Sequence, residues 1–204
     1  MPLSAARAVR PAPIALISTS MDAPISDEQL MQHYREGQYA AFEQLYARHR
    51  PPLLRFYRRQ TGSPELAEEL LQEVFMRLIR SRERYQPSAP LRIFLWQIAR
   101  NLLIDHYRRQ RRSLPSSYAD FDPDQVAASE RVQPDHAAAH NQQLERLLSL
   151  IGELPCAQRE AFLLREEAGL SLTEIAQLAG VSTDTVKSRL RYAIGKLRRA
   201  LEET

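Results

Sequence analysis

Side chains able to carry out catalysis or bind a metal are present, but their spacing favours neither chemistry. Glu68 and Glu69 are adjacent, as are Glu166 and Glu167. Neighbours in a helix point about 100° apart, so neither pair can serve as general acid and base on one substrate. The five histidines are scattered, Cys156 is the single cysteine, and no glycine-rich phosphate loop or nucleophile motif occurs. The sequence therefore predicts a protein that is not an enzyme, with no metal site and no cofactor.

A second kind of chemistry is indicated where arginines cluster with aromatic residues between Leu91 and Arg112. The net charge of the 204-residue chain is only +3, so this local excess of cations is more informative than the total. Cationic side chains can follow a phosphate backbone while aromatic rings stack on bases, the combination that holds single-stranded or melted DNA. Phe94 and Trp96 could instead lie in the core; the pattern favours the core for Phe94 and leaves both alternatives open for Trp96.

A further candidate DNA-binding stretch occupies residues 171–199. Its pattern predicts a short helix over 172–178, a turn at Gly180, and a longer helix that begins at about Thr183 with Ser182 as its N-cap. Apolar residues recur along one side of the longer helix at Val186, Leu190, Ala193, Leu197 and Leu201. The opposite side is polar and cationic, which suits a helix lying in the major groove of DNA. The alternative is a solvated surface helix with terminal cations, and the preceding short helix and glycine turn make it the weaker one.

The elements that must position these residues are helices. From Ser26 onward apolar residues recur at helical spacing, and no strand pattern of period two is found, so we predict an all-α fold. Proline and glycine mark most helix ends; in particular, Pro51 and Pro52 predict that a new helix starts there. The expected helices run from Ser26 to a break near Gly37, from about Ala41 to Arg50, from Pro51 to Thr61, over Glu65–Arg82, over Leu91–Arg112, from Leu144 to Leu154 and over Cys156–Ala168.

The chain is predicted to contain two small helical domains. Residues 113–135 are rich in proline and acidic residues and poor in large apolar ones, which predicts a flexible acidic linker. It separates a helical domain over 25–112 from a four-helix domain over 136–204, and residues 1–24 are expected to be a disordered extension. No stretch approaches the roughly 18 apolar residues of a membrane span, so we expect a cytoplasmic protein without membrane insertion. Met21 is an alternative start, because the helical pattern begins just after it.

Motifs in these helices resemble two regions of bacterial RNA polymerase sigma factors. Similarity to the second region is carried by Ala67–Phe75 and Phe94–Asp105, and similarity to the fourth region by 154–164, Glu174–Ala176 and Thr185–Leu190. A chain that has only these two regions and a short acidic linker is similar to the extracytoplasmic-function (ECF) group. The resemblance covers about residues 25–200. It implies a sigma region-two helical bundle followed by a C-terminal helix-turn-helix domain.

The resemblance also implies a function, partners and site residues. Such a subunit binds core RNA polymerase, directs it to promoters by recognising the −35 and −10 elements, and melts the DNA. The implied contacts with the coiled coil of the largest polymerase subunit are Glu69, Gln72, Glu73 and Phe75. The implied contacts with the −10 element and the melting edge are Tyr85, Trp96, Arg100, Asn101, Asp105 and Arg108. The implied −35 contacts are Thr183, Thr185, Lys187, Ser188, Arg189, Arg191 and Tyr192. An anti-sigma factor is a further implied partner, and the basic tail at 196–199 could contact either phosphate or the polymerase flap.

The sequence departs from the usual pattern of the ECF group at three places. Glu69 stands where the group usually has aspartate, a longer carboxylate that can still pair with a basic partner. Phe94 and Trp96 stand where tryptophan and tyrosine are usual, an exchange of aromatic sizes that could repack this helix. Tyr192 stands where arginine is usual, so the −35 preference need not follow the common one.

Two other functions stay open at this point. A stand-alone helix-turn-helix repressor or activator would need only the second domain, and it would leave the first without a role. A sigma-like adaptor would bind polymerase without melting DNA, and substitution of Arg100, Asn101 and Arg108 would leave its function intact.

Overall fold

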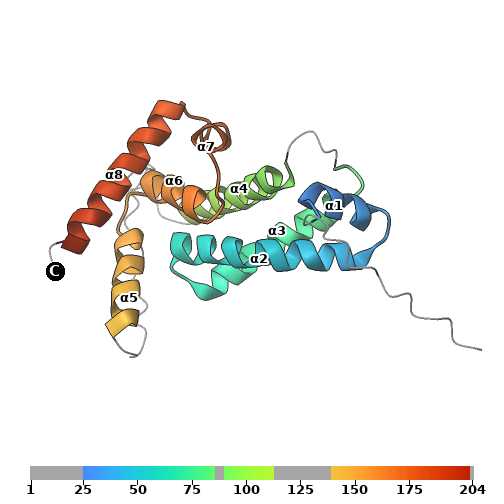
Figure 1. Cartoon of the computed structure of the whole chain (residues 1–204), viewed down its shortest axis with the longest axis horizontal. Helices are drawn as coiled ribbons and strands as arrows, with labels where there is room; N and C mark the ends of the chain where they lie inside the picture. The colour runs from blue at the N-terminus through green and yellow to red at the C-terminus, as the bar shows by residue number, and fades with distance from the viewer. Residues whose placement is uncertain (1–24, 86–89, 113–138, 203–204) are drawn as a thin grey trace, which may run out of the picture.

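The computed structural model describes residues 25–85, 90–112 and 139–202, and within these ranges the chain forms eight helices and no strand (Figure 1). The helices are α1 (Asp27–Arg35), α2 (Tyr39–Thr61), α3 (Pro64–Ser81), α4 (Leu91–Arg112), α5 (Ala139–Gly152), α6 (Cys156–Glu166), α7 (Leu172–Ala179) and α8 (Thr183–Glu202). The prediction of an all-α fold is confirmed for the described residues. The predicted extension over 1–24 and linker over 113–135 lie outside them.

Helices α1 to α4 pack into the first bundle. α2 lies against α1, α3 and α4, and α3 also packs on α4. Large side chains fill the centre: the ring of Trp96 meets that of Phe56 edge-on at 5.2 Å between centroids, and the hydroxyl of Tyr57 donates to the carbonyl of Ala99 at 2.9 Å. α3 begins as expected, with the Ser63 hydroxyl accepting from the amide of Leu66.

The prediction of a new helix at Pro51 is wrong, since α2 runs through Pro51 and Pro52 without a break. A proline inside a helix removes the amide that would donate to the carbonyl four residues earlier, here those of Ala47 and Arg48. Both residues are exposed, so solvent can satisfy these carbonyls. The buried face of α2 continues on both sides of the prolines, through Leu45, His49, Leu53 and Phe56. Packing of that continuous face keeps the helix whole.

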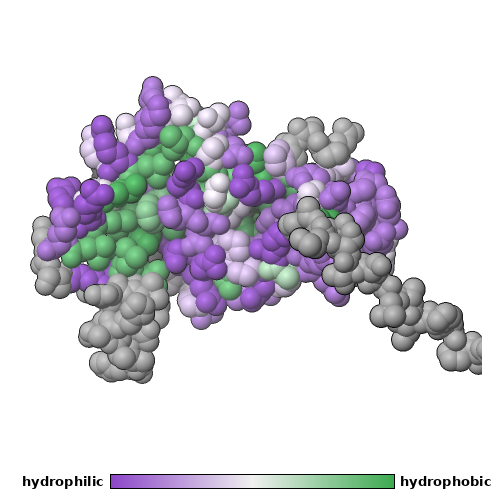
Figure 2. Space-filling view, in the orientation of Figure 1, coloured by the Kyte–Doolittle hydropathy of each residue, from purple (hydrophilic) through white to green (hydrophobic). Residues whose placement is uncertain are grey.

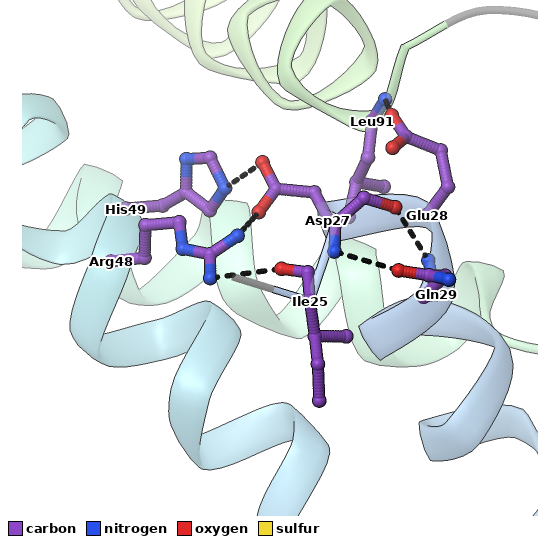
Figure 3. A network of polar contacts seen from close by, with 8 residues as sticks. Ile25, Asp27, Glu28, Gln29, Arg48, His49 and Leu91 are labelled. Atoms are coloured by element: carbon purple, nitrogen blue, oxygen red, sulfur yellow. Dashed lines mark hydrogen bonds and ion pairs between the residues drawn. The ribbon is translucent and has the colours of Figure 1, made fainter. Parts of the chain in front are cut away.

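A network of polar contacts fastens α1 to its neighbours (Figure 3). The carboxylate of Asp27 contacts the guanidinium of Arg48 and, at 2.7 Å, the Nε2 atom of the buried His49. Glu28 accepts a hydrogen bond from the amide of Leu91 at 2.8 Å, which caps the first turn of α4. Burial alone would raise the pKa of Asp27, but the contacts with His49 and Arg48 outweigh it and hold the pKa below its ordinary value.

Replacing Asp27 with asparagine is therefore expected to destabilise the chain by about 1–3 kcal/mol at neutral pH. Because the folded-state pKa of Asp27 lies below 3.8, the carboxylate stabilises the fold above that pH and ceases to do so as the pH falls through the folded value. The variant should lose less stability on acidification than the natural chain. Urea melts between pH 3 and 7 measure this, with the exposed Glu43→Gln as control. Parallel pH profiles for both variants would contradict the assignment.

Helices α5 to α8 form the second domain. α8 packs against α5, α6 and α7, and buried leucines of α6, including Leu163 and Leu164, fill its centre. α6 ends at Glu166, two residues before the expected end, and Gly169 follows with a φ of 62°. α7 opens with a capping box, in which Ser171 and Glu174 satisfy each other's amides.

The two domains also contact each other. α6 lies against α2, and α7 against α4, so the second domain covers part of one side of the first (Figure 1). Among the described helices, none has the length and apolar character to cross a membrane.

Candidate functional site

The predicted helix-turn-helix is present in α7 and α8. Gly180 separates the helices in the left-handed region, with a φ of 68° that a residue without Cβ adopts at no steric cost. Ser182 opens α8, because its hydroxyl oxygen accepts a hydrogen bond from the amide of Thr185 at 3.1 Å. These contacts at the two ends of the turn fix the direction of α8.

α8 presents one side to its own domain and the other to solvent. The predicted apolar side of α8 is buried at Val186, Leu190, Ala193 and Leu197. Leu201 is 44% exposed, so the buried side of the helix ends one turn earlier than predicted. Of the predicted −35 residues, Lys187, Arg191 and Tyr192 are exposed, whereas Thr183, Thr185, Ser188 and Arg189 are half-buried. All seven lie in the first half of α8.

Weak contacts hold the cations of this surface. The ammonium group of Lys187 donates to the carboxylate of Asp184 at 3.0 Å, and both side chains are strongly exposed. The guanidinium of Arg191 lies 5.3 Å from the ring centre of Tyr192. Exposed ion pairs of this kind contribute little to stability, so a phosphate group can replace the carboxylate at small cost.

On α4 the predicted DNA contacts divide between two faces. Asn101, Asp105 and Arg108 are exposed at positions i, i+4 and i+7, which form one stripe along the helix. Arg100 instead faces the second domain, where its Nε atom donates to Glu160 at 3.0 Å. The stripe is therefore open to a ligand, and Arg100 is engaged within the chain.

The aromatic candidates lie deeper than the sequence indicated. Trp96 is only 1% exposed and belongs to the core, so its ring offers no face for a base in this structure. Tyr85 is half-buried, its ring is 5.7 Å from that of Phe94, and burial raises its pKa. Phe94 packs against the core, the alternative that its sequence pattern favoured.

Only some of the docking residues predicted on α3 are exposed. Glu69 and Gln72 are exposed and Glu73 is half-buried, but Phe75 is 4% exposed, with its ring 4.5 Å from that of Tyr46. Its neighbour Met76 is exposed instead, as is Ile79.

Together the exposed residues Glu69, Gln72, Met76 and Ile79 follow one another at spacings of three, four and three, and we call this line the α3 stripe. Such spacing is that of a coiled-coil seam, so the α3 stripe has the geometry to pack along another helix. Half of it is polar and half apolar. The spacing could have identified Met76 and Ile79 from the sequence, but choosing this face required knowing which side of α3 is buried.

Within residues 25–85, 90–112 and 139–202, no group of three or more histidine, cysteine or acidic side chains could hold a metal ion. The exposed candidate residues lie on three helix faces: the first half of α8, the stripe on α4 and the α3 stripe.

Comparison with known proteins assigns both domains. The family model for Sigma-70 region 2 matches residues 45–113, and that for Sigma-70, region 4 matches residues 144–197. The RNA polymerase sigma factor CarQ of Myxococcus xanthus is 36% identical over 174 residues, which cover 85% of this chain and 96% of CarQ. The ECF RNA polymerase sigma factor SigL of Mycobacterium tuberculosis is 34% identical over 80% of this chain and 90% of SigL.

Solved structures have a similar fold. CnrH, in complex with the cytosolic domain of CnrY, matches with a TM-score of 0.62 at 25% identity, over 87% of this chain and 97% of CnrH. The sigma factor RpoE of Bartonella quintana, in complex with the anti-sigma factor NepR, matches with a TM-score of 0.64 at 24% identity, over 79% of this chain and 96% of RpoE. The matches to both regions and the extent of similarity to CarQ and SigL show that the chain belongs to the ECF group of RNA polymerase sigma factors, which bind core polymerase and direct promoter-specific transcription initiation.

Proposed function

We propose that this sigma factor uses three separate helix faces: the α3 stripe for core polymerase, the stripe of Asn101, Asp105 and Arg108 on α4 for the −10 element, and the first half of α8 for the −35 element. The observation that carries the proposal is the exposure of all three faces while the two domains are packed together. Promoter recognition and polymerase binding then need no unfolding of either domain.

The α3 stripe fits the coiled coil of the largest polymerase subunit in shape and chemistry. Its seam spacing matches that of a helix packing along a coiled coil, and Glu69 offers a carboxylate to a basic partner. Met76 and Ile79 supply apolar anchors of the kind that dominate binding energy in interfaces. Phe75 takes a supporting role beneath the stripe, since its ring packs against Tyr46 and Phe42.

The stripe on α4 supplies complementary groups for DNA at the melting edge. Asn101 can donate to and accept from a base edge, while Arg108 can neutralise a phosphate. The side-chain amide of Gln97 donates to the side-chain oxygen of Asn101 at 3.3 Å, which orients Asn101 from within the same helix. Tyr85 follows the end of α3 and precedes α4. Its half-buried ring keeps an accessible part that can contact an unpaired base of the −10 element.

Replacing Asn101 or Arg108 with alanine should therefore reduce promoter opening by the holoenzyme. Loss of a base contact costs about 1–3 kcal/mol, and loss of a phosphate contact lowers the salt slope of binding by about 0.9. Permanganate reactivity of thymines in the −10 element measures opening, and the exposed Gln110→Ala is the matched control. Unchanged opening in both variants would remove Asn101 and Arg108 from the contacts that open the promoter, and no opening with the natural chain would favour an adaptor that does not melt DNA.

On α8, the exposed Lys187 and Arg191 are suited to phosphate or guanine, and the partly buried Ser188 to a base edge at close approach. Tyr192, 59% exposed, adds an aromatic surface at the end of this half. A stand-alone repressor or activator would use this face alone. It would give no role to the α3 stripe or to the stripe on α4.

A protein partner of the second domain is also part of the proposal. Figure 2 shows hydrophobic residues gathered on the face over α6 and α8, and Leu148, Ile194 and Leu201 are exposed in this domain. CnrH was solved with the cytosolic domain of CnrY, which supports an anti-sigma factor as one partner. The polymerase flap is the other expected partner, next to the basic end of α8. We place this regulatory, non-enzymatic function in the cytoplasm, where core polymerase acts.

A further inference from the structure

Four arginines of the first domain pair with three carboxylates of the second across the contact between the domains. On α2, the Nε atom of Arg55 donates to Glu167 at 2.7 Å, and Arg59 contacts the other oxygen of the same carboxylate. On α4, Arg92 pairs with Glu174 of α7 at 3.2 Å and Arg100 pairs with Glu160 of α6 at 3.0 Å. In these pairs the cation always belongs to the first domain and the carboxylate to the second.

The arginines of α2 and α4 meet the same segment of the second domain, because Arg92 also donates to the carbonyls of Ala168 and Gly169, which directly follow Glu167. The two helices are joined by hydrogen bonds from the hydroxyl of Tyr57 to the carbonyl of Ala99 at 2.9 Å and from the hydroxyl of Tyr107 to the carbonyl of Gln60 at 2.8 Å. Burial raises the pKa of Tyr107 to about 12, so this donor keeps its proton at any physiological pH. Arg55 and Arg59 lie one turn apart on α2, beside this junction with α4.

Some buried polar groups at the contact between the domains are left without partners. Both side-chain polar atoms of Gln60, which is 3% exposed, and the Nε atom of the buried Arg159 have no hydrogen-bond partner. Arg159 reaches across to the carbonyl of Arg59 only at 3.5 Å. A buried polar group without a partner destabilises the closed arrangement, and water can satisfy such a group when the domains separate.

A carboxylate on a guanidinium and a phosphate on a guanidinium are chemically alike, because both present a pair of anionic oxygens to a fork of donors. We propose that Arg55, Arg59, Arg92 and Arg100 form a binding surface for the DNA phosphate backbone, which Glu160, Glu167 and Glu174 occupy until DNA replaces them. This inference rests on promoter DNA being a ligand of the first domain. It adds Arg55, Arg59 and Arg92 to the DNA contacts, and it makes closure of the domains and binding at this surface mutually exclusive.

Two variants distinguish a phosphate-binding surface from ion pairs that only hold the two domains together. Glu167→Gln weakens closure, so the free full-length chain should bind a fluorescent mixed-sequence duplex with a single-stranded fork about 5-fold or more tightly than the natural chain. Adding Arg55→Gln to Glu167→Gln should reverse part of that gain. It should also lower the slope of log K against log salt by about 0.9, the value for one lost phosphate contact.

Matched controls are available on the same helices. Glu166→Gln removes the exposed neighbouring carboxylate, and Arg58→Gln removes a cation of α2 that pairs within its own domain, with Glu68 at 3.5 Å. Both should leave DNA binding unchanged to within about 2-fold. Thermal melts check that each variant is folded. If Glu167→Gln has a markedly lower melting temperature than the natural chain, Glu160→Gln, which releases Arg100, replaces it.

Each outcome decides the matter. Tighter binding by Glu167→Gln, with loss of affinity and salt slope on adding Arg55→Gln, supports the phosphate surface. Tighter binding that Arg55→Gln leaves unchanged would contradict the proposal, because these ion pairs would then only hold the domains together. An unchanged DNA affinity of Glu167→Gln would show that closure does not exclude DNA. Because core polymerase is absent from this assay, these outcomes are independent of whether the chain initiates transcription.

Discussion

Replacing Trp96 with alanine is expected to lower the free energy of unfolding by about 3–5 kcal/mol, the usual cost of removing a buried aromatic ring. Trp96 is 1% exposed, and it meets Phe56 edge-on in the centre of the first domain. A loss of this size is a large part of the stability of a typical domain. Urea unfolding followed by circular dichroism measures it, and Trp96→Phe, which keeps most of the ring volume, should lose markedly less.

The same variant separates two roles for this residue. If Trp96 stacked on a base, alanine would leave stability nearly unchanged and would abolish promoter opening by an otherwise normal holoenzyme. The structure places the ring in the core, so we expect loss of stability first, with loss of activity following from the smaller folded fraction.

Substitution in the α3 stripe is expected to have the largest effect on polymerase binding. Met76→Glu places a charge among the apolar anchors, and Glu69→Lys reverses the charge offered to the coiled coil. Anchors near the centre of an interface are worth about 2–4 kcal/mol, so Met76→Glu should weaken binding to core polymerase roughly 30-fold or more. Both residues are exposed, so the melting temperature should hardly change.

Fluorescence anisotropy of the labelled chain with purified core polymerase measures this affinity. Glu166→Lys makes the same charge change as Glu69→Lys at an exposed position of the second domain, and it should bind like the natural chain. Normal core binding by both Met76→Glu and Glu69→Lys would remove the α3 stripe from the interface.

Helical periodicity was sufficient to predict most of the fold. The bounds of α4 and the start of α8 follow from apolar spacing and from the N-cap Ser182, which are local features of the chain. Pro51 and Pro52 misled because the continuous buried face of α2 outweighs their two missing amide donors. That balance depends on packing against α1, α3 and α4, which no local pattern contains.

The sites were predicted less well where two faces of one helix compete. Phe75 and Met76 are neighbours pointing about 100° apart, and only the packing of α3 decides which is exposed. Trp96 was ambiguous for the same reason. The contact of Arg55 with Glu167 joins residues 112 positions apart, and spacing in a single sequence carries no signal for such a pair.

The most direct test of the central claim is transcription by core polymerase with the purified chain on a library of genomic promoters. We predict discrete start sites that depend on the chain and share two sequence elements at a fixed spacing, one for α4 and one for α8. Absence of any core-dependent start, together with tight sequence-specific DNA binding by the chain alone, would contradict the account and indicate a stand-alone regulator.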